Sequence, residues 1–128
     1  MTIDCTIKKP SGPVIITASG PVNGKDIIEA LIKMLQDPDF KEGMDALWDF
    51  RTVHSGNSET AEIREIVSFV RANQKKRGIN YRVALVVSRD IDFGLARMFE
   101  AYSHELPFDI QIFKDFNDAQ KWLNPSNH

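Results

Sequence analysis

The densest group of chemically active residue types lies between residues 49 and 58. Asp49 is followed by His54 and by two serines, Ser55 and Ser58. A carboxylate, an imidazole and a hydroxyl are the groups of a hydrolytic triad, in which the imidazole takes the proton of the hydroxyl. The chain lacks the G-x-S-x-G turn that presents such a serine in one large class of hydrolases. We therefore interpret these residues as a solvated loop and predict that the protein is not an enzyme, with an uncharacterised enzymatic activity as the weakest alternative.

The histidines and the glycine-rich segment do not have the spacing of a metal or phosphate site. His54, His104 and His128 are far apart, and no H-x-x-x-H or C-x-x-C motif brings zinc ligands together. Segment 20–25 ends in Gly-Lys but lacks the spacing of a phosphate-binding loop, and Pro21 removes a backbone N–H that would bind a phosphate. We expect no metal and no cofactor.

A group of large apolar side chains falls within one predicted helix, residues 91–105. It has more apolar residues than one buried helix face requires, so part of it is a candidate lining for a pocket or a self-association surface. Packing in the core is the favoured interpretation for the group as a whole. Its members are Phe93, Leu95, Met98, Phe99 and Tyr102.

Charge and hydropathy argue against two classes of partner. Sixteen basic and eighteen acidic residues give a net charge of -2, which provides no overall attraction for nucleic acid. The basic run Lys75-Lys76-Arg77 is assigned to a helix C-terminus, where cations interact favourably with the helix dipole. No apolar run approaches the roughly 20 residues that cross a bilayer, and the first residues lack a signal-peptide pattern. We expect a cytoplasmic protein without membrane insertion.

Two hydrophobic periodicities alternate along the chain and predict an α/β fold. Strands are predicted at 2–8, 14–18, 44–50, 82–88 and 108–113, and helices at 25–37, 59–76, 91–105 and 116–123. The order ββαβαβαβα implies an N-terminal hairpin joined to a mixed, mostly parallel sheet of about five strands, covered by about four helices. The nearly continuous apolar run 82–88 is typical of a strand covered on both faces. We expect one domain over residues 1–128, with 124–128 as a polar tail.

Three stretches of the chain together carry a family resemblance. Residues 46–51 (Ala-Leu-Trp-Asp-Phe-Arg) match an L-x-D-hydrophobic-R/S strand end. Residues 82–87 are followed by a polar loop and the helix start Phe-Gly-Leu-Ala at 93–96. Residues 112–123 resemble an F-x-D-x-x-x-A-x-x-W-L ending. Together these stretches resemble SpoIIAA-like families, which share the fold of the sulfate-transporter and anti-sigma-factor-antagonist (STAS) domains. The resemblance covers about 15–123 and implies a SpoIIAA/STAS-like domain.

The same resemblance implies a regulatory surface in the loop before the second helix. Anti-sigma antagonists carry a regulatory serine there, and the ungapped position in this chain is Ser58, with Asn57 where the family usually has Asp. The family's next two residues, Ser-Gly, are replaced by Glu59-Thr60, and a helix-capping role for Asn57 or Ser58 is the simpler interpretation. The implied partner-binding surface comprises Asp49, Arg51, His54, Ser55, Asn57 and Ser58.

Two functions from different classes remain as predictions. The first is a non-enzymatic, STAS-like small regulatory or interaction domain that binds a protein partner or a second copy of itself. The second comes from a likeness to lipid-binding domains with a helical gate over the sheet. It is a carrier of a lipid or small hydrophobic ligand in a pocket under helix 91–105, lined by the five residues of the apolar group.

Overall fold

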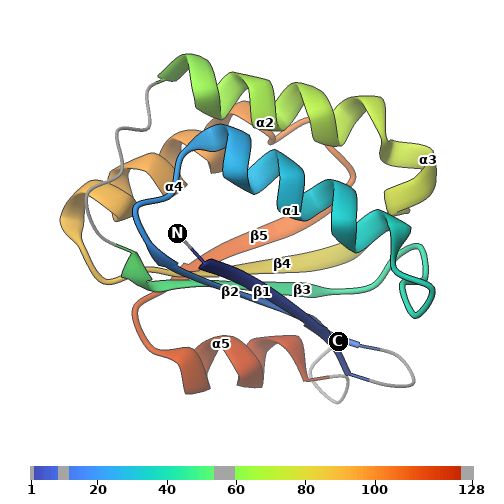
Figure 1. Ribbon diagram of the computed structural model, residues 1–128, viewed down its shortest axis with the longest axis horizontal. Coiled ribbons are helices and arrows are strands. Elements are labelled where there is room, and N and C mark those ends of the chain that lie inside the picture. Colours follow the sequence, from blue (N-terminus) through green and yellow to red (C-terminus); the bar gives the residue numbers. More distant parts are fainter. Residues whose placement is uncertain (1, 9–11, 54–59, 125–128) are drawn as a thin grey trace.

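The computed structural model describes residues 2–8, 12–53 and 60–124. Within these ranges the chain forms five strands and five helices (Figure 1). The strands are β1 (Thr2–Ile7), β2 (Val14–Gly20), β3 (Ala46–Val53), β4 (Tyr81–Val86) and β5 (Phe108–Phe113). The helices are α1 (Gly24–Gln36), α2 (Thr60–Ala72), α3 (Gln74–Arg77), α4 (Asp90–Tyr102) and α5 (Phe116–Leu123).

The strands form a single sheet in the order β1-β2-β3-β4-β5. β1 and β2 pair antiparallel, and each later pair is parallel. The predicted hairpin and the mixed, mostly parallel sheet are therefore confirmed. β4 lies between β3 and β5 and is buried along nearly its whole length, as its apolar run predicts. β5 is at the sheet edge, and its residues alternate between half-buried and exposed.

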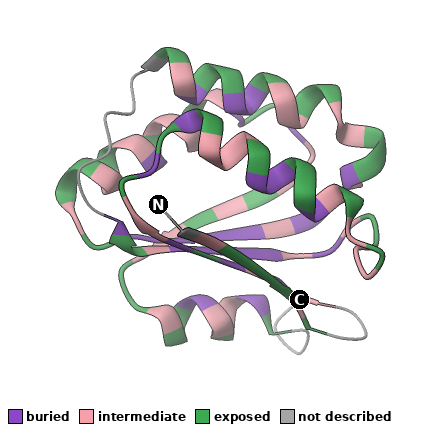
Figure 2. Ribbon diagram, in the orientation of Figure 1, coloured by how far each residue is buried: buried purple, intermediate pink, exposed green. Residues whose placement is uncertain are grey.

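The two faces of the sheet carry unequal layers. α1, α2, α3 and α4 cover one face, and α5 alone covers the other (Figure 1). Adjacent residues of a strand point to opposite faces, so Trp48 of β3 joins the core beneath the larger helical layer while Leu47 packs with Leu123 of α5. Figure 2 shows that the buried residues concentrate along the central strands and on the helix faces that meet them. The larger core lies between the sheet and the four-helix layer.

The helix predicted at 59–76 is interrupted in the structure, which gives one helix more than the sequence predicted. The interruption is at Asn73, whose side-chain amide donates a hydrogen bond to the Phe69 carbonyl at 2.8 Å. Such a local side-chain bond competes with the regular backbone ladder. The short helix α3 then ends at Gly78, which has a φ of +98°. This change of direction determines where Arg77, the last residue of α3, is placed.

Candidate functional site

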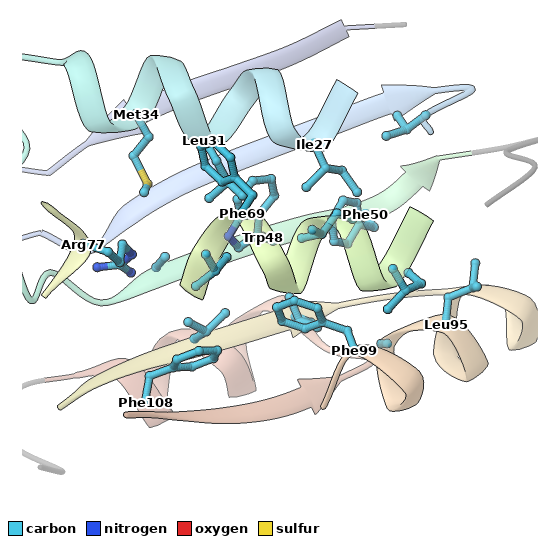
Figure 3. Close-up of a pocket in the computed structure, with 18 of the residues that line it drawn as sticks. Ile27, Leu31, Met34, Trp48, Phe50, Phe69, Arg77, Leu95, Phe99 and Phe108 are labelled. Carbon is cyan, nitrogen blue, oxygen red and sulfur yellow. The ribbon is translucent and has the colours of Figure 1, made fainter. Parts of the chain in front are cut away.

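A cavity of about 130 Å³ lies between the larger helical layer and the sheet (Figure 3). Side chains of α1, α2 and α4 line it from the helical side, and side chains of β3 and β4 line it from the sheet. The two large aromatic rings on this face of β3 belong to Trp48 and Phe50, which stack with their centroids 5.9 Å apart. Aliphatic and aromatic side chains dominate the lining, which includes Leu31, Trp48, Phe50, Ile66, Leu85 and Phe99.

The apolar group predicted on helix 91–105 contributes only in part to this cavity. Leu95 and Phe99 of α4 belong to the lining, whereas Phe93, Met98 and Tyr102 do not. The Phe93 ring lies 5.2 Å from the Arg97 guanidinium and 5.6 Å from the Lys114 ammonium. The Tyr102 ring lies 5.1 Å from the Arg64 guanidinium, and Met98 is half-buried. The cavity therefore extends over α1 and α2 much further than the sequence indicated.

One cationic side chain, Arg77, lies in the lining of this largely apolar cavity. The residue is 5% exposed. Its Nη1 and Nη2 atoms are buried and, within the described part of the chain, have no hydrogen-bond partner. The guanidinium carbon is 3.6 Å from the centroid of the Tyr81 ring and 5.5 Å from that of Phe40. Tyr81 in turn stacks on Phe108, with ring centroids 5.0 Å apart.

The backbone around Arg77 is fixed by a close approach of two glycines. The Gly43 N–H donates a 2.8 Å hydrogen bond to the Arg77 carbonyl. A Cβ atom on Gly78 would lie within 3 Å of the Gly43 backbone, so a larger residue does not fit there. Gly78 also has a positive φ, which favours glycine. The turn therefore sets Arg77 at one end of the cavity, while Leu95 lies toward the other end in Figure 3.

Burial dominates the electrostatics of this guanidinium. Loss of solvent lowers the pKa of Arg77 to about 10, although the nearby Tyr81 and Asp45 oppose that fall. Burial likewise raises the pKa of Tyr81, and Arg77 partly offsets the rise. At neutral pH Arg77 is therefore a cation and Tyr81 a neutral phenol. Asp45 accepts a 2.8 Å hydrogen bond from the Arg82 N–H through its Oδ1.

The other charged side chain of the lining is already neutralised. Asp92 of α4 accepts two hydrogen bonds from the Arg89 guanidinium, at 2.7 and 2.9 Å. Among the described residues, Arg77 is thus the charged group of the lining whose guanidinium ends are left unsatisfied. Buried polar atoms without partners are uncommon in native proteins, and each calls for an explanation.

The predicted regulatory surface is described only at its first two residues. Asp49 is 6% exposed and accepts three hydrogen bonds from Arg51: 3.0 Å from its backbone N–H, 2.9 Å from Nε and 2.8 Å from Nη2. Burial raises the pKa of Asp49, but the Arg51 hydrogen bonds outweigh it, so the net pKa lies below its ordinary value.

Arg51 lies on the α5 side of the sheet, with its guanidinium 4.8 Å from the Phe116 ring. His54, Ser55, Asn57 and Ser58 lie outside the described residues. The role of this surface in binding a partner stays a prediction.

Sequence reasoning missed Arg77 because it treated the whole run Lys75-Lys76-Arg77 as cations at a helix C-terminus. Lys75 and Lys76 are indeed exposed, but Arg77 is buried. A signal was present: the lining residues between 60 and 77 include positions 63, 66, 70, 73 and 77, with steps of three and four, and Phe69 beside them. That spacing defines one helix face, and it places Arg77 on the apolar side.

The described ranges lack two further kinds of site. They contain no group of three or more His, Cys, Asp or Glu residues able to hold a metal ion. None of the helices described is long and apolar enough to cross a membrane.

Comparison with known proteins supports the architecture. No protein-family model matches the sequence, and no curated protein matches it. A solved structure, that of an uncharacterised protein of the DUF3478 family with a SpoIIAA-like fold from Shewanella loihica PV-4, is similar to this chain with a TM-score of 0.60. The two share 17% sequence identity, and the match covers 95% of this chain and 92% of that one. The chain therefore has a SpoIIAA-like fold, as the sequence resemblance predicted.

Proposed function

We propose that this protein is a non-enzymatic domain that binds a small hydrophobic ligand in the cavity between its larger helical layer and its sheet. The observation that carries the proposal is the cavity itself, a void of about 130 Å³ with a mainly apolar lining. Protein interiors pack as tightly as organic crystals and contain few voids larger than a water molecule. At about 24 cal/mol per Å³, a fully enclosed and empty void of this size would cost about 3 kcal/mol, which is the upper bound for this partly open cavity.

The size of the cavity limits the ligand. An engineered apolar cavity of roughly 150 Å³ in another protein binds benzene, and drug-sized ligands occupy roughly 300 Å³ or more. The apolar part of the ligand is therefore about as large as one six-membered ring or a short alkyl chain. A long-chain lipid exceeds the volume of this cavity.

The test is binding of toluene to the purified protein, measured by ligand-observed NMR, together with a variant that fills the cavity. Ala96 lines the cavity and is 7% exposed, so Ala96→Leu places three further carbons in the void. We expect toluene to bind the wild type and not this variant. Ala101→Leu, on the exposed side of the same helix, is the matched control and should bind as the wild type does.

Two results would count against the proposal. One is a wild type that does not bind toluene, and the other is an Ala96→Leu protein that binds it as tightly as the wild type. If Ala96→Leu fails to fold, as judged by circular dichroism, Val83→Ile adds a single methyl group to the lining from β4 and provides a milder test. Native mass spectrometry of freshly purified protein adds a direct search for a co-purified small molecule.

The family resemblance also predicts that the domain docks a protein partner or a second copy of itself. A cytoplasmic location likewise remains a prediction. The SpoIIAA-like fold is compatible with a docking function. Asp49 and Arg51, the described part of the proposed docking surface, bond to each other on the α5 side of the sheet. Size-exclusion chromatography with light scattering tests self-association, for which we expect a dimer that Arg51→Glu weakens.

A further inference from the structure

We propose that the ligand is a small amphipathic monoanion, a carboxylate with an apolar body of about ring size, and that Arg77 binds its carboxylate. This inference rests on the proposed function, because it names the chemical class of the molecule in the cavity. It goes further by assigning a binding residue that a purely apolar ligand would not need.

The free hydrogen-bond donors of Arg77 are at the end of its side chain. Nη1 and Nη2 are the two ends of the guanidinium fork, and both lack hydrogen-bond partners among the described residues. A planar fork of this kind matches a carboxylate with two parallel hydrogen bonds. The face of the guanidinium is already used, because it stacks on Tyr81 at 3.6 Å. The edge that remains is the one through which an arginine binds an anion.

The groups closest to the Arg77 guanidinium are aromatic rings. Facing Arg77 are the Tyr81 phenol, the Phe40 ring and, through a longer-range attraction, Asp45. Asp45 accepts a hydrogen bond from the β4 backbone at Arg82, and its attraction for the Arg77 charge acts without a hydrogen bond to Nη1 or Nη2. An anion at hydrogen-bond distance strongly stabilises a cation that is buried in apolar surroundings. The environment therefore selects a negatively charged head.

The lining can neutralise a single negative charge on the head of the ligand. One guanidinium neutralises one negative charge, and Asp92, the other charged lining residue, is already paired with Arg89. A phosphate monoester carries about -1.5 to -2 at pH 7, which would leave negative charge in an apolar cavity. A carboxylate carries a single charge, so a monocarboxylate fits and a phosphate monoester does not.

The experiment compares matched probes by isothermal titration calorimetry. Phenylacetate and 2-phenylethanol have similar apolar bodies and differ in the head, and phenyl phosphate tests the second charge. We expect the wild type to bind phenylacetate at least about tenfold more tightly than the other two, as hydrogen bonds to a charged group predict. Arg77→Met should remove this preference and change the affinity for 2-phenylethanol by less than about threefold, since the cavity remains. Arg97→Met, which alters an exposed arginine, is the control and should keep the preference.

The outcomes separate the two proposals. Equal binding of phenylacetate and 2-phenylethanol by the wild type would overturn the role of Arg77 and leave a hydrophobic-ligand domain standing. A tighter complex with phenyl phosphate would overturn the monocarboxylate assignment, as would a carboxylate preference that survives Arg77→Met. Failure of all three probes and of toluene would overturn the proposed function as well. Circular dichroism of Arg77→Met confirms that the variant is folded before its affinities are compared.

Discussion

Replacing Arg77 by methionine is expected to stabilise the protein in the absence of ligand. The fall of its pKa to about 10 corresponds to about 3 kcal/mol by which burial of the charge destabilises the native state. Methionine removes this cost and keeps a long, flexible, apolar side chain. It also loses the stacking of the cation on Tyr81 and Phe40, which is worth about 0.5–2 kcal/mol. The net expectation is a gain of about 1–2 kcal/mol in the free energy of unfolding.

Urea unfolding measures this gain directly. Fluorescence of Trp48, which is buried, and of Trp122, which is half-buried, should report the transition, and Arg77→Met should raise the midpoint without changing the slope. Arg97→Met, at an exposed ion pair, should change stability by less than about 0.5 kcal/mol. A loss of about 1 kcal/mol or more in Arg77→Met would refute the reasoning, because removing a well-paired buried charge is destabilising. Arg77 would then have a partner in the protein itself.

Three further expectations come from other parts of the structure. Asp49→Asn should lower the free energy of unfolding by about 1–3 kcal/mol at pH 7. The hydrogen bonds from Arg51 hold the pKa of Asp49 below its ordinary 3.8. The stability that Asp49 contributes is therefore fully present above pH 3.8 and is lost as pH falls through the lowered pKa. Urea titrations from pH 6 to pH 2.5 should show that the wild type is more stable than Asp49→Asn, with a difference that shrinks only below about pH 4. Gly78→Ala should cost at least about 2 kcal/mol in thermal unfolding, since its φ is positive and the added Cβ meets the Gly43 backbone. Gly94→Ala, in α4 with nothing within 4 Å of the new Cβ, should gain about 0.5–1 kcal/mol, and the opposite ranking of the two glycine variants would contradict the model of the turn. Finally, phenylacetate at 100 times its dissociation constant should add about 2.7 kcal/mol to the stability of the wild type, and calorimetry should find most of that gain missing in Arg77→Met.

The sheet was predictable because its signals are local. The run 82–88 is apolar almost throughout, and such a run at strand length leaves few alternatives to a buried strand; β4 is that strand. Residues 108–113 alternate between apolar and polar, which is typical of a strand with one wetter face, and β5 is a strand at the sheet edge. In both cases the sequence pattern reflects which faces of the strand are covered and which meet solvent. The position of the strand in the folded sheet decides the same thing.

The cavity was not predictable in the same way. A void depends on how side chains from α1, α2, α4 and the sheet meet, and each of those segments separately has the pattern of an ordinary core element. The position of Arg77 depended on a helix interruption at Asn73, where a single side-chain hydrogen bond decides the outcome. Charge patterning grouped Arg77 with Lys75 and Lys76 at a helix C-terminus, because composition does not record which face of a helix is covered.

The void and the unsatisfied cation occur at the same place, and that coincidence constrains the ligand more than either feature alone. Filling the void with an apolar body recovers at most about 3 kcal/mol of cavity cost but leaves the Arg77 fork unpaired. An inorganic anion would satisfy the fork but leave the apolar lining empty. Together the two features cost at most about 6 kcal/mol, a large share of the 5–15 kcal/mol by which domains are stable. Binding sites are where proteins tolerate such losses, and only a molecule with an apolar body and an anionic head relieves both.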